Sequence, residues 1–188
     1  MFTTTVSQAR DEMARLRKEM NTKFQAIDDN TSYSESGRRF EKAKVVLEYR
    51  KTAGRMKEQF ISEIGARRVE LQRQLFGLPE GGDALSYRDA TDRASRIVSK
   101  AEASNMLQQA IRTGDDILAR AVGARAYQFG MSNVLDAYSQ NAGKTLSLNE
   151  LRDLPDENAG SVDLLFHVRS AGLEHSELSE AETAVGAN

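Results

Sequence analysis

The sequence contains no cysteine and no tryptophan, and its 188 residues include only two prolines and two histidines. Without cysteine there is no disulfide framework, no thiolate zinc site and no cysteine nucleophile. Aromatic residues make up 6% of the chain, whereas alanine, arginine, glutamate and leucine are plentiful, which favours helices over sheets. Because Pro79 and Pro155 are so far apart, long helices can form without interruption.

Long apolar runs are also missing. No stretch approaches the roughly 20 apolar residues that a membrane-spanning helix needs, so we expect no membrane partner. The N-terminal residues Met1 to Thr5 lack a basic segment followed by an apolar run, and we therefore expect no secretion signal.

Apolar residues at intervals of three and four predict two amphipathic helices, over about residues 5–29 and 36–75. A forty-residue helix is about 60 Å long, which exceeds the width of a small domain. We therefore expect the first helix to fold back on the second as an antiparallel, coiled-coil-like hairpin.

Glycine and proline between residues 77 and 82 predict a break in the helical pattern. The sequence thus predicts an all-α protein with a helical hairpin over 1–78, a hinge over 79–83 and a small helical domain over 84–173. Residues 174–188 are rich in glutamate, serine and alanine, which is typical of a disordered acidic tail. Two capping boxes are predicted in the small domain, Ser99 with Glu102 and Ser147 with Glu150.

Charge is distributed unevenly along the chain. Residues 1–80 contain 16 basic and 12 acidic side chains, whereas residues 145–188 contain 2 basic and 9 acidic ones. Such an acidic end either stays solvated, screens the basic part of its own chain or meets a basic partner.

Patterns that would indicate catalysis or ligand binding are incomplete. Gly143-Lys144-Thr145 resembles the end of a phosphate-binding loop, but Tyr138 stands where that loop needs a glycine. His167 and His175 are not at a helical metal-binding spacing. We therefore predict no catalytic residue, no metal site, no cofactor and no enzymatic activity.

Basic residues are frequent on the second helix and form a candidate phosphate-contacting face. Glutamates are interleaved with them, which is more typical of a solvated or partner-facing helix. The sequence favours the second interpretation and leaves nucleic-acid binding as the alternative. The candidate residues for that alternative are Arg50, Lys51, Arg55, Lys57, Arg67 and Arg68.

Residues 71–140 include Leu75-Phe76-Gly77, Arg88-Asp89-Ala90, Leu118-Ala119-Arg120-Ala121-Val122 and Leu135-Asp136-Ala137-Tyr138. In this order they resemble small helical proteins encoded among the virion genes of tailed bacteriophages of actinobacteria. The resemblance implies a structural or assembly role in the head or tail, with other structural proteins as partners. It also implies a location in the virion or the bacterial host cytoplasm.

The second half of the long helix is expected to extend beyond the shorter first helix. It has four large apolar side chains whose exposure to water would be costly. Either the domain after the hinge or another copy of the chain would have to cover them, and the length of the helix together with the hinge favours a homo-oligomer. These candidate contact residues are Phe60, Ile64, Leu71 and Leu75.

Overall fold

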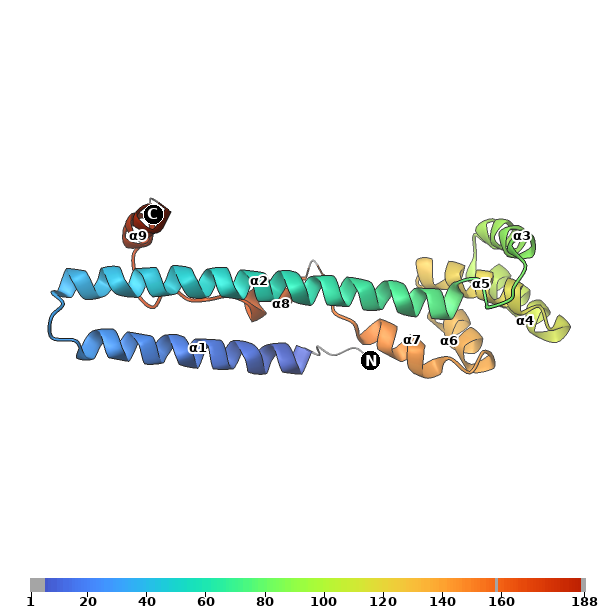
Figure 1. Ribbon diagram of the computed structural model, residues 1–188. Helices are drawn as coiled ribbons and strands as arrows, with labels where there is room; N and C mark the ends of the chain where they lie inside the picture. Colours follow the sequence, from blue (N-terminus) through green and yellow to red (C-terminus); the bar gives the residue numbers. More distant parts are fainter. Residues whose placement is uncertain (1–5, 158, 187–188) are drawn as a thin grey trace. The chain divides into compact units, whose positions relative to one another are not determined.

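A computed structural model describes residues 6–157 and 159–186 of the chain. Within these ranges the regular structure consists of nine α-helices and no strand, which confirms the predicted all-α class (Figure 1). The helices are α1 (Val6–Asp29), α2 (Glu35–Phe76), α3 (Ala84–Ser95), α4 (Lys100–Thr113), α5 (Asp116–Gln128), α6 (Ser132–Asn141), α7 (Thr145–Asp153), α8 (Gly160–Leu165) and α9 (His175–Gly186).

The helix α2 is a single element of 42 residues. At 1.5 Å per residue it is about 63 Å long. Its ends lie within one residue of the predicted ones, because the apolar periodicity continues through Gly54 and Gly65 and stops at Gly77. Glycine inside a helix costs only about 1 kcal/mol, which the packing of a long helix can offset.

The chain forms two compact units, and their boundaries differ from the predicted ones. One unit combines Met1–Gly65 with Pro155–Asn188, and the other is Ala66–Leu154. The predicted hinge at 79–83 therefore lies inside the second unit. The reason is that the last turns of α2 belong to the same hydrophobic core as α3 to α7, so the Gly-Pro segment is a turn within one unit.

In the first unit, side chains of α1 contact the first part of α2. Lys23 Nζ lies 3.0 Å from Glu48 and 5.0 Å from the ring centre of Tyr49, and Lys42 Nζ lies 2.7 Å from Asp28. Thus a later residue of α1 meets an earlier residue of α2. The predicted apolar seam of α1 faces inward, with Ala9, Met13 and Met20 buried.

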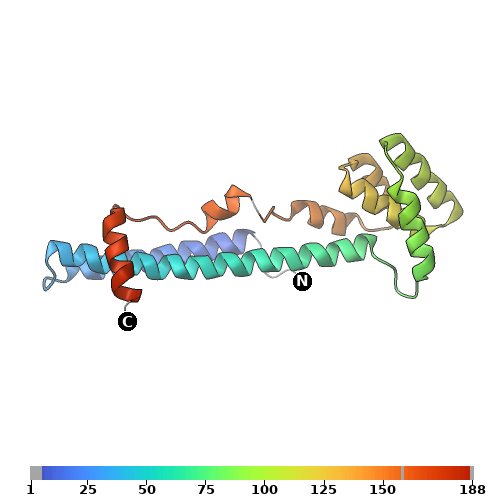
Figure 2. The same ribbon diagram turned by 90° about the horizontal axis from the view of Figure 1, so that it is seen from above.

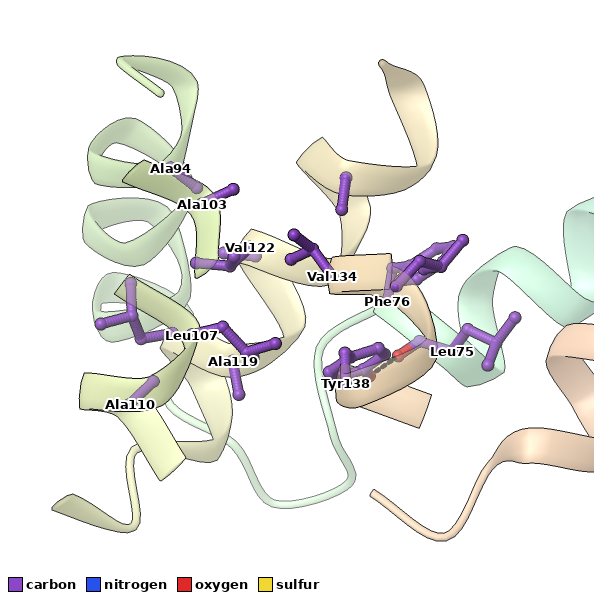
Figure 3. Close-up of a cluster of buried hydrophobic side chains, with 14 of the residues drawn as sticks. Leu75, Phe76, Ala94, Ala103, Leu107, Ala110, Ala119, Val122, Val134 and Tyr138 are labelled. Atoms are coloured by element: carbon purple, nitrogen blue, oxygen red, sulfur yellow. Dashed lines mark hydrogen bonds between the residues drawn. The ribbon is translucent and has the colours of Figure 1, made fainter. Parts of the chain in front are cut away.

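The second unit has a core rich in alanine and leucine from α3 to α7 and the end of α2, with Phe76 and Tyr138 among its members (Figure 3). Several alanines, among them Ala103, Ala119 and Ala126, are almost fully buried and allow the helices to approach closely. One half of the capping box of Ser99 and Glu102 is confirmed, since Glu102 N donates to the N-cap Ser99 Oγ at 3.2 Å. The other half differs, because the Glu102 carboxylate accepts from Val98 N at 3.0 Å, one residue before the N-cap.

The second predicted capping box is wrong. The helix α7 begins at Thr145, so Ser147 lies inside it, and no side chain caps its first turn. Leu146, the residue before Ser147, is 86% exposed. Glu150 instead pairs with Arg67, a contact between residues far apart in the chain.

Over residues 174–186 the structure also differs from the predicted disordered tail, whose last two positions, 187 and 188, lie outside the described ranges. The helix α9 spans His175–Gly186 and lies across the N-terminal part of α2 (Figure 2). Its docking is apolar, because Leu173, Leu178 and Ala181 are buried in a cluster with Ala43 and Val46 of α2. The prediction of disorder was based on the glutamate-, serine- and alanine-rich composition of this segment, which does not indicate that Leu178 and Ala181 pack against α2.

Candidate functional site

The four apolar residues expected to form a contact between copies are buried within the chain. Phe60 is 2% exposed, and Ile64, Leu71 and Leu75 are fully buried. The ring of Phe60 packs against that of Phe166, with 5.4 Å between the ring centres. Leu71 and Leu75 belong to the core of the second unit. The chain itself therefore covers these side chains, and they provide no reason for self-association.

The six candidate phosphate-contacting residues do not form one free basic face. Lys57 pairs with Asp163 at 2.5 Å, and Arg50 Nε donates to the carbonyl oxygen of Val168 at 3.4 Å. Arg68 is half-buried, whereas Lys51 and Arg55 are exposed. Part of the positive charge of this group is thus engaged in intramolecular contacts and is less available to the phosphates of a nucleic acid.

Arg67 has the most complete set of acidic partners in this group. Its Nε and Nη2 atoms each lie 2.7 Å from a different oxygen of Glu150, and Nη1 lies 2.8 Å from Glu70. The hydrogen bonds from Arg67 lower the pKa of Glu150, and those to Glu150 and Glu70 raise the pKa of Arg67. Such a fork-shaped pair fixes the position of both side chains.

Side chains from the second unit hold the end of α2, where the last carbonyl groups have no partners within the helix. Tyr87 Oη donates to Phe76 O at 3.0 Å, and Arg120 Nη1 donates to Gly77 O at 3.2 Å. Tyr138 donates to Leu75 O, and Lys144 donates to Gln74 O (Figure 3 shows the bond from Tyr138). We call Tyr87, Arg120, Tyr138 and Lys144 the α2 cap. Its two cations also complement the partial negative charge at the helix C-terminus.

Burial shifts the pKa values of two members of the α2 cap. Burial raises the pKa of Tyr138 to about 12 and lowers the pKa of Lys144. Lys144 is the residue that resembles a phosphate-binding lysine in the sequence. In the structure its ammonium group is used on a backbone carbonyl of α2 instead.

Within residues 6–157 and 159–186, no group of three or more histidine, aspartate or glutamate side chains could hold a metal ion. The two histidines are both exposed: His167 follows α8, and His175 is the first residue of α9. The structure therefore does not bring a set of ligands together around either one.

A pocket of about 480 Å³ lies in the first unit, between α1 and the segment around and after α8. We call it the basic pocket because two arginines and a histidine line it and no carboxylate does. Its lining residues are Arg17, Met20, Asn21, Leu164, His167, Arg169 and Ala171. No pattern in the sequence predicts this pocket, since its residues come from distant parts of the chain and follow no motif.

No family model, curated protein or solved structure matches this chain. Among the helices in the described part of the chain, none combines the length and apolar character needed to cross a membrane. The expected lack of a secretion signal concerns the N-terminus, of which residues 1–5 lie outside the described ranges.

Proposed function

We propose that this protein is a non-enzymatic helical assembly protein that acts through contacts with other proteins, in the head or tail of a bacteriophage particle. The particle assignment derives from the resemblance of residues 71–140. The single structural observation that carries the assembly role is the α2 cap, which fixes the end of a 42-residue helix in a unit of five further helices. A long helix whose end is fixed can hold partner proteins at defined positions, as an assembly protein must.

Exposed apolar side chains on the second unit favour contacts with partner proteins. Leu85 is 72% exposed, Val98 81% and Leu146 86%. Contact with another protein would remove such side chains from water at a gain of roughly 25 cal/mol per Å². A contact between copies of this chain would have to use residues of this kind, since Phe60, Ile64, Leu71 and Leu75 are already covered.

The finer architecture that suits this role is an antiparallel, coiled-coil-like hairpin of α1 with the first half of α2. The ion pairs of Lys23 with Glu48 and of Asp28 with Lys42 support it, because the residue numbers rise on one helix as they fall on the other. Each exposed pair contributes little free energy, at most about 1 kcal/mol, but together they favour one register.

Nucleic-acid binding is less well supported. Arg50, Lys57 and Arg67 already donate to oxygen atoms of the protein. A salt titration with generic duplex DNA separates the two functions, because binding through phosphates weakens steeply as salt rises. The assembly role predicts no measurable binding at physiological salt, and tight binding with a steep salt slope would favour the alternative.

The assembly role itself can be tested by deleting the gene from a phage that encodes this protein. Electron microscopy of the infected cells should then show incomplete particles, while genome replication continues. Complementation with the intact protein should restore complete particles. Particles of normal yield and shape without the protein would contradict the proposal.

A further inference from the structure

The basic pocket combines positive charge with an apolar surface. Its volume of about 480 Å³ lies within the range of pockets that bind small ligands or side chains. Arg17 and Asn21 line it from α1, and His167 and Arg169 line it from the chain after α8. Met20 forms a buried part of the wall, whereas Leu164 is 75% exposed.

The cations of this pocket lack acidic partners among the residues that the structure describes. By contrast, Arg39 pairs with Glu177 and Arg67 with Glu150 elsewhere in the chain. No ion pair joins Arg17 or Arg169 to a carboxylate in the described ranges. Two guanidinium groups that share one hollow without a counter-charge attract an anion.

Backbone contacts hold Arg17 in place for such a ligand. Its Nη2 atom donates to Leu165 O at 2.8 Å and to His167 O at 3.2 Å. A guanidinium has five N–H donors, so those on Nε and Nη1 are left for another acceptor. Because the protein already orders the Arg17 side chain, less conformational entropy is lost when a ligand binds.

We propose that the basic pocket binds an acidic segment of a partner protein. A carboxylate of that segment pairs with Arg17 and Arg169, and a neighbouring apolar side chain packs on Met20 and Leu164. The apolar part of the pocket favours a peptide over a lone phosphate, which would leave Leu164 in water. A nucleic acid is also disfavoured, because it requires cations spaced along a strand and not one compact pocket.

This inference rests on the proposed function only in taking a protein as the partner. Fluorescence anisotropy with a labelled peptide of glutamate and leucine residues tests it on the intact chain. Two matched peptides serve as comparisons, one with glutamine in place of glutamate and one with serine in place of leucine. Inorganic phosphate and a DNA oligonucleotide are added as competitors.

Arg169→Gln is the principal variant, because Arg169 is exposed and we therefore expect its replacement to change the stability of the fold little. We expect it to weaken binding of the glutamate–leucine peptide at least about fivefold, as expected for the loss of one charge-assisted hydrogen bond. Leu164→Ser should weaken binding as well. Arg55→Gln, which removes an exposed arginine outside the pocket, is the matched control and should bind like the unmodified protein.

Equal binding by Arg169→Gln and the unmodified protein would overturn the inference, as would no saturable binding at about 1 mM peptide. Equal affinity for the serine peptide, or displacement by a few mM phosphate or by the oligonucleotide, would show a site for anions of another kind. None of these outcomes touches the assembly role, which the gene deletion tests separately.

Discussion

The hydroxyl group of Tyr138 donates a hydrogen bond to the backbone carbonyl oxygen of Leu75, which lies 63 residues earlier in the chain. Both residues are almost fully buried, and the ring of Tyr138 also lies close to that of Phe76. A Cβ atom at Gly123 would come within 2.7 Å of the Tyr138 ring, so glycine is needed on α5 for this approach. The bond therefore joins the end of α2 to the centre of the second unit.

Replacing Tyr138 with phenylalanine should destabilise the protein. The ring is kept, but the carbonyl of Leu75 loses a partner in a buried environment, which costs about 1 to 3 kcal/mol. Urea denaturation followed by circular dichroism measures the change. Tyr33→Phe is the control, because Tyr33 is 37% exposed, and it should have little effect. Equal stability of both variants would mean that the bond to Leu75 contributes nothing measurable.

The same tyrosine predicts a loss of stability at alkaline pH. Burial raises its pKa from about 10 to about 12, so the fold favours the protonated phenol. As pH rises above 10, the unfolded chain releases this proton while the folded chain retains it. The stabilisation of the fold that results from this difference in pKa is therefore fully present below pH 10 and is lost as pH rises through 12. Between pH 8 and 11.5, the melting temperature should fall less steeply with pH for Tyr138→Phe than for the unmodified protein. Equal slopes for the two proteins would refute the linkage.

Phe60→Ala should destabilise the first unit by about 3 to 5 kcal/mol, because Phe60 is buried against Phe166. Val69→Ala is a matched control on the same helix, since Val69 is 65% exposed, and it should change stability by no more than about 0.5 kcal/mol. Thermal denaturation measures stability, and sedimentation velocity measures assembly state. An unchanged melting temperature together with dissociation of an oligomer would restore the role first expected for Phe60.

The docking of α9 should depend on pH in the acidic range. Hydrogen bonds from Arg39, and then from the backbone of Glu174, lower the pKa of Glu177 from 4.5 to about 2. A carboxyl group with a lowered pKa stabilises the fold at pH values above 4.5, its pKa in the unfolded chain. This stabilisation is lost as the pH falls through about 2. Backbone NMR shifts of α9 should thus show docking at pH 7 and release as pH approaches 2.

Glu177→Gln separates this effect from general acid unfolding. It removes the charge that pairs with Arg39, so the shifts should report a less populated α9 already at pH 7. Glu180→Gln is the control, because Glu180 is exposed on the same helix. If the two variants have the same population of docked α9, the ion pair with Arg39 does not hold the helix.

Local patterns in the sequence were sufficient to predict α1, α2 and the start of α4. The spans of α1 and α2 follow from apolar spacing, and the start of α4 follows from Ser99 as its N-cap. These features depend on residues within a turn or two of one another. The capping box expected at Ser147 was wrong because α7 begins at Thr145, which places Ser147 inside the helix, and Glu150 pairs with Arg67.

Contacts between distant residues could not be predicted in this way. The coverage of Phe60 by Phe166 and of α2 by α9 depends on the return of residues 155–186 to the first unit. The basic pocket is equally non-local, since Arg17 and Arg169 lie near opposite ends of the chain. No spacing rule links such residues, and their charge alone resembles that of any solvated surface.

Quantitative mass spectrometry of purified phage particles tests the assembly role most directly. Particles from a phage that encodes this protein should be separated from free protein on a density gradient, and assembly intermediates should be collected as well. The assembly role predicts that the protein is present in the particles or the intermediates at a fixed ratio to other structural proteins, with chemical cross-links to at least one of them. Its absence from both fractions while it is abundant in the infected cell would contradict the account.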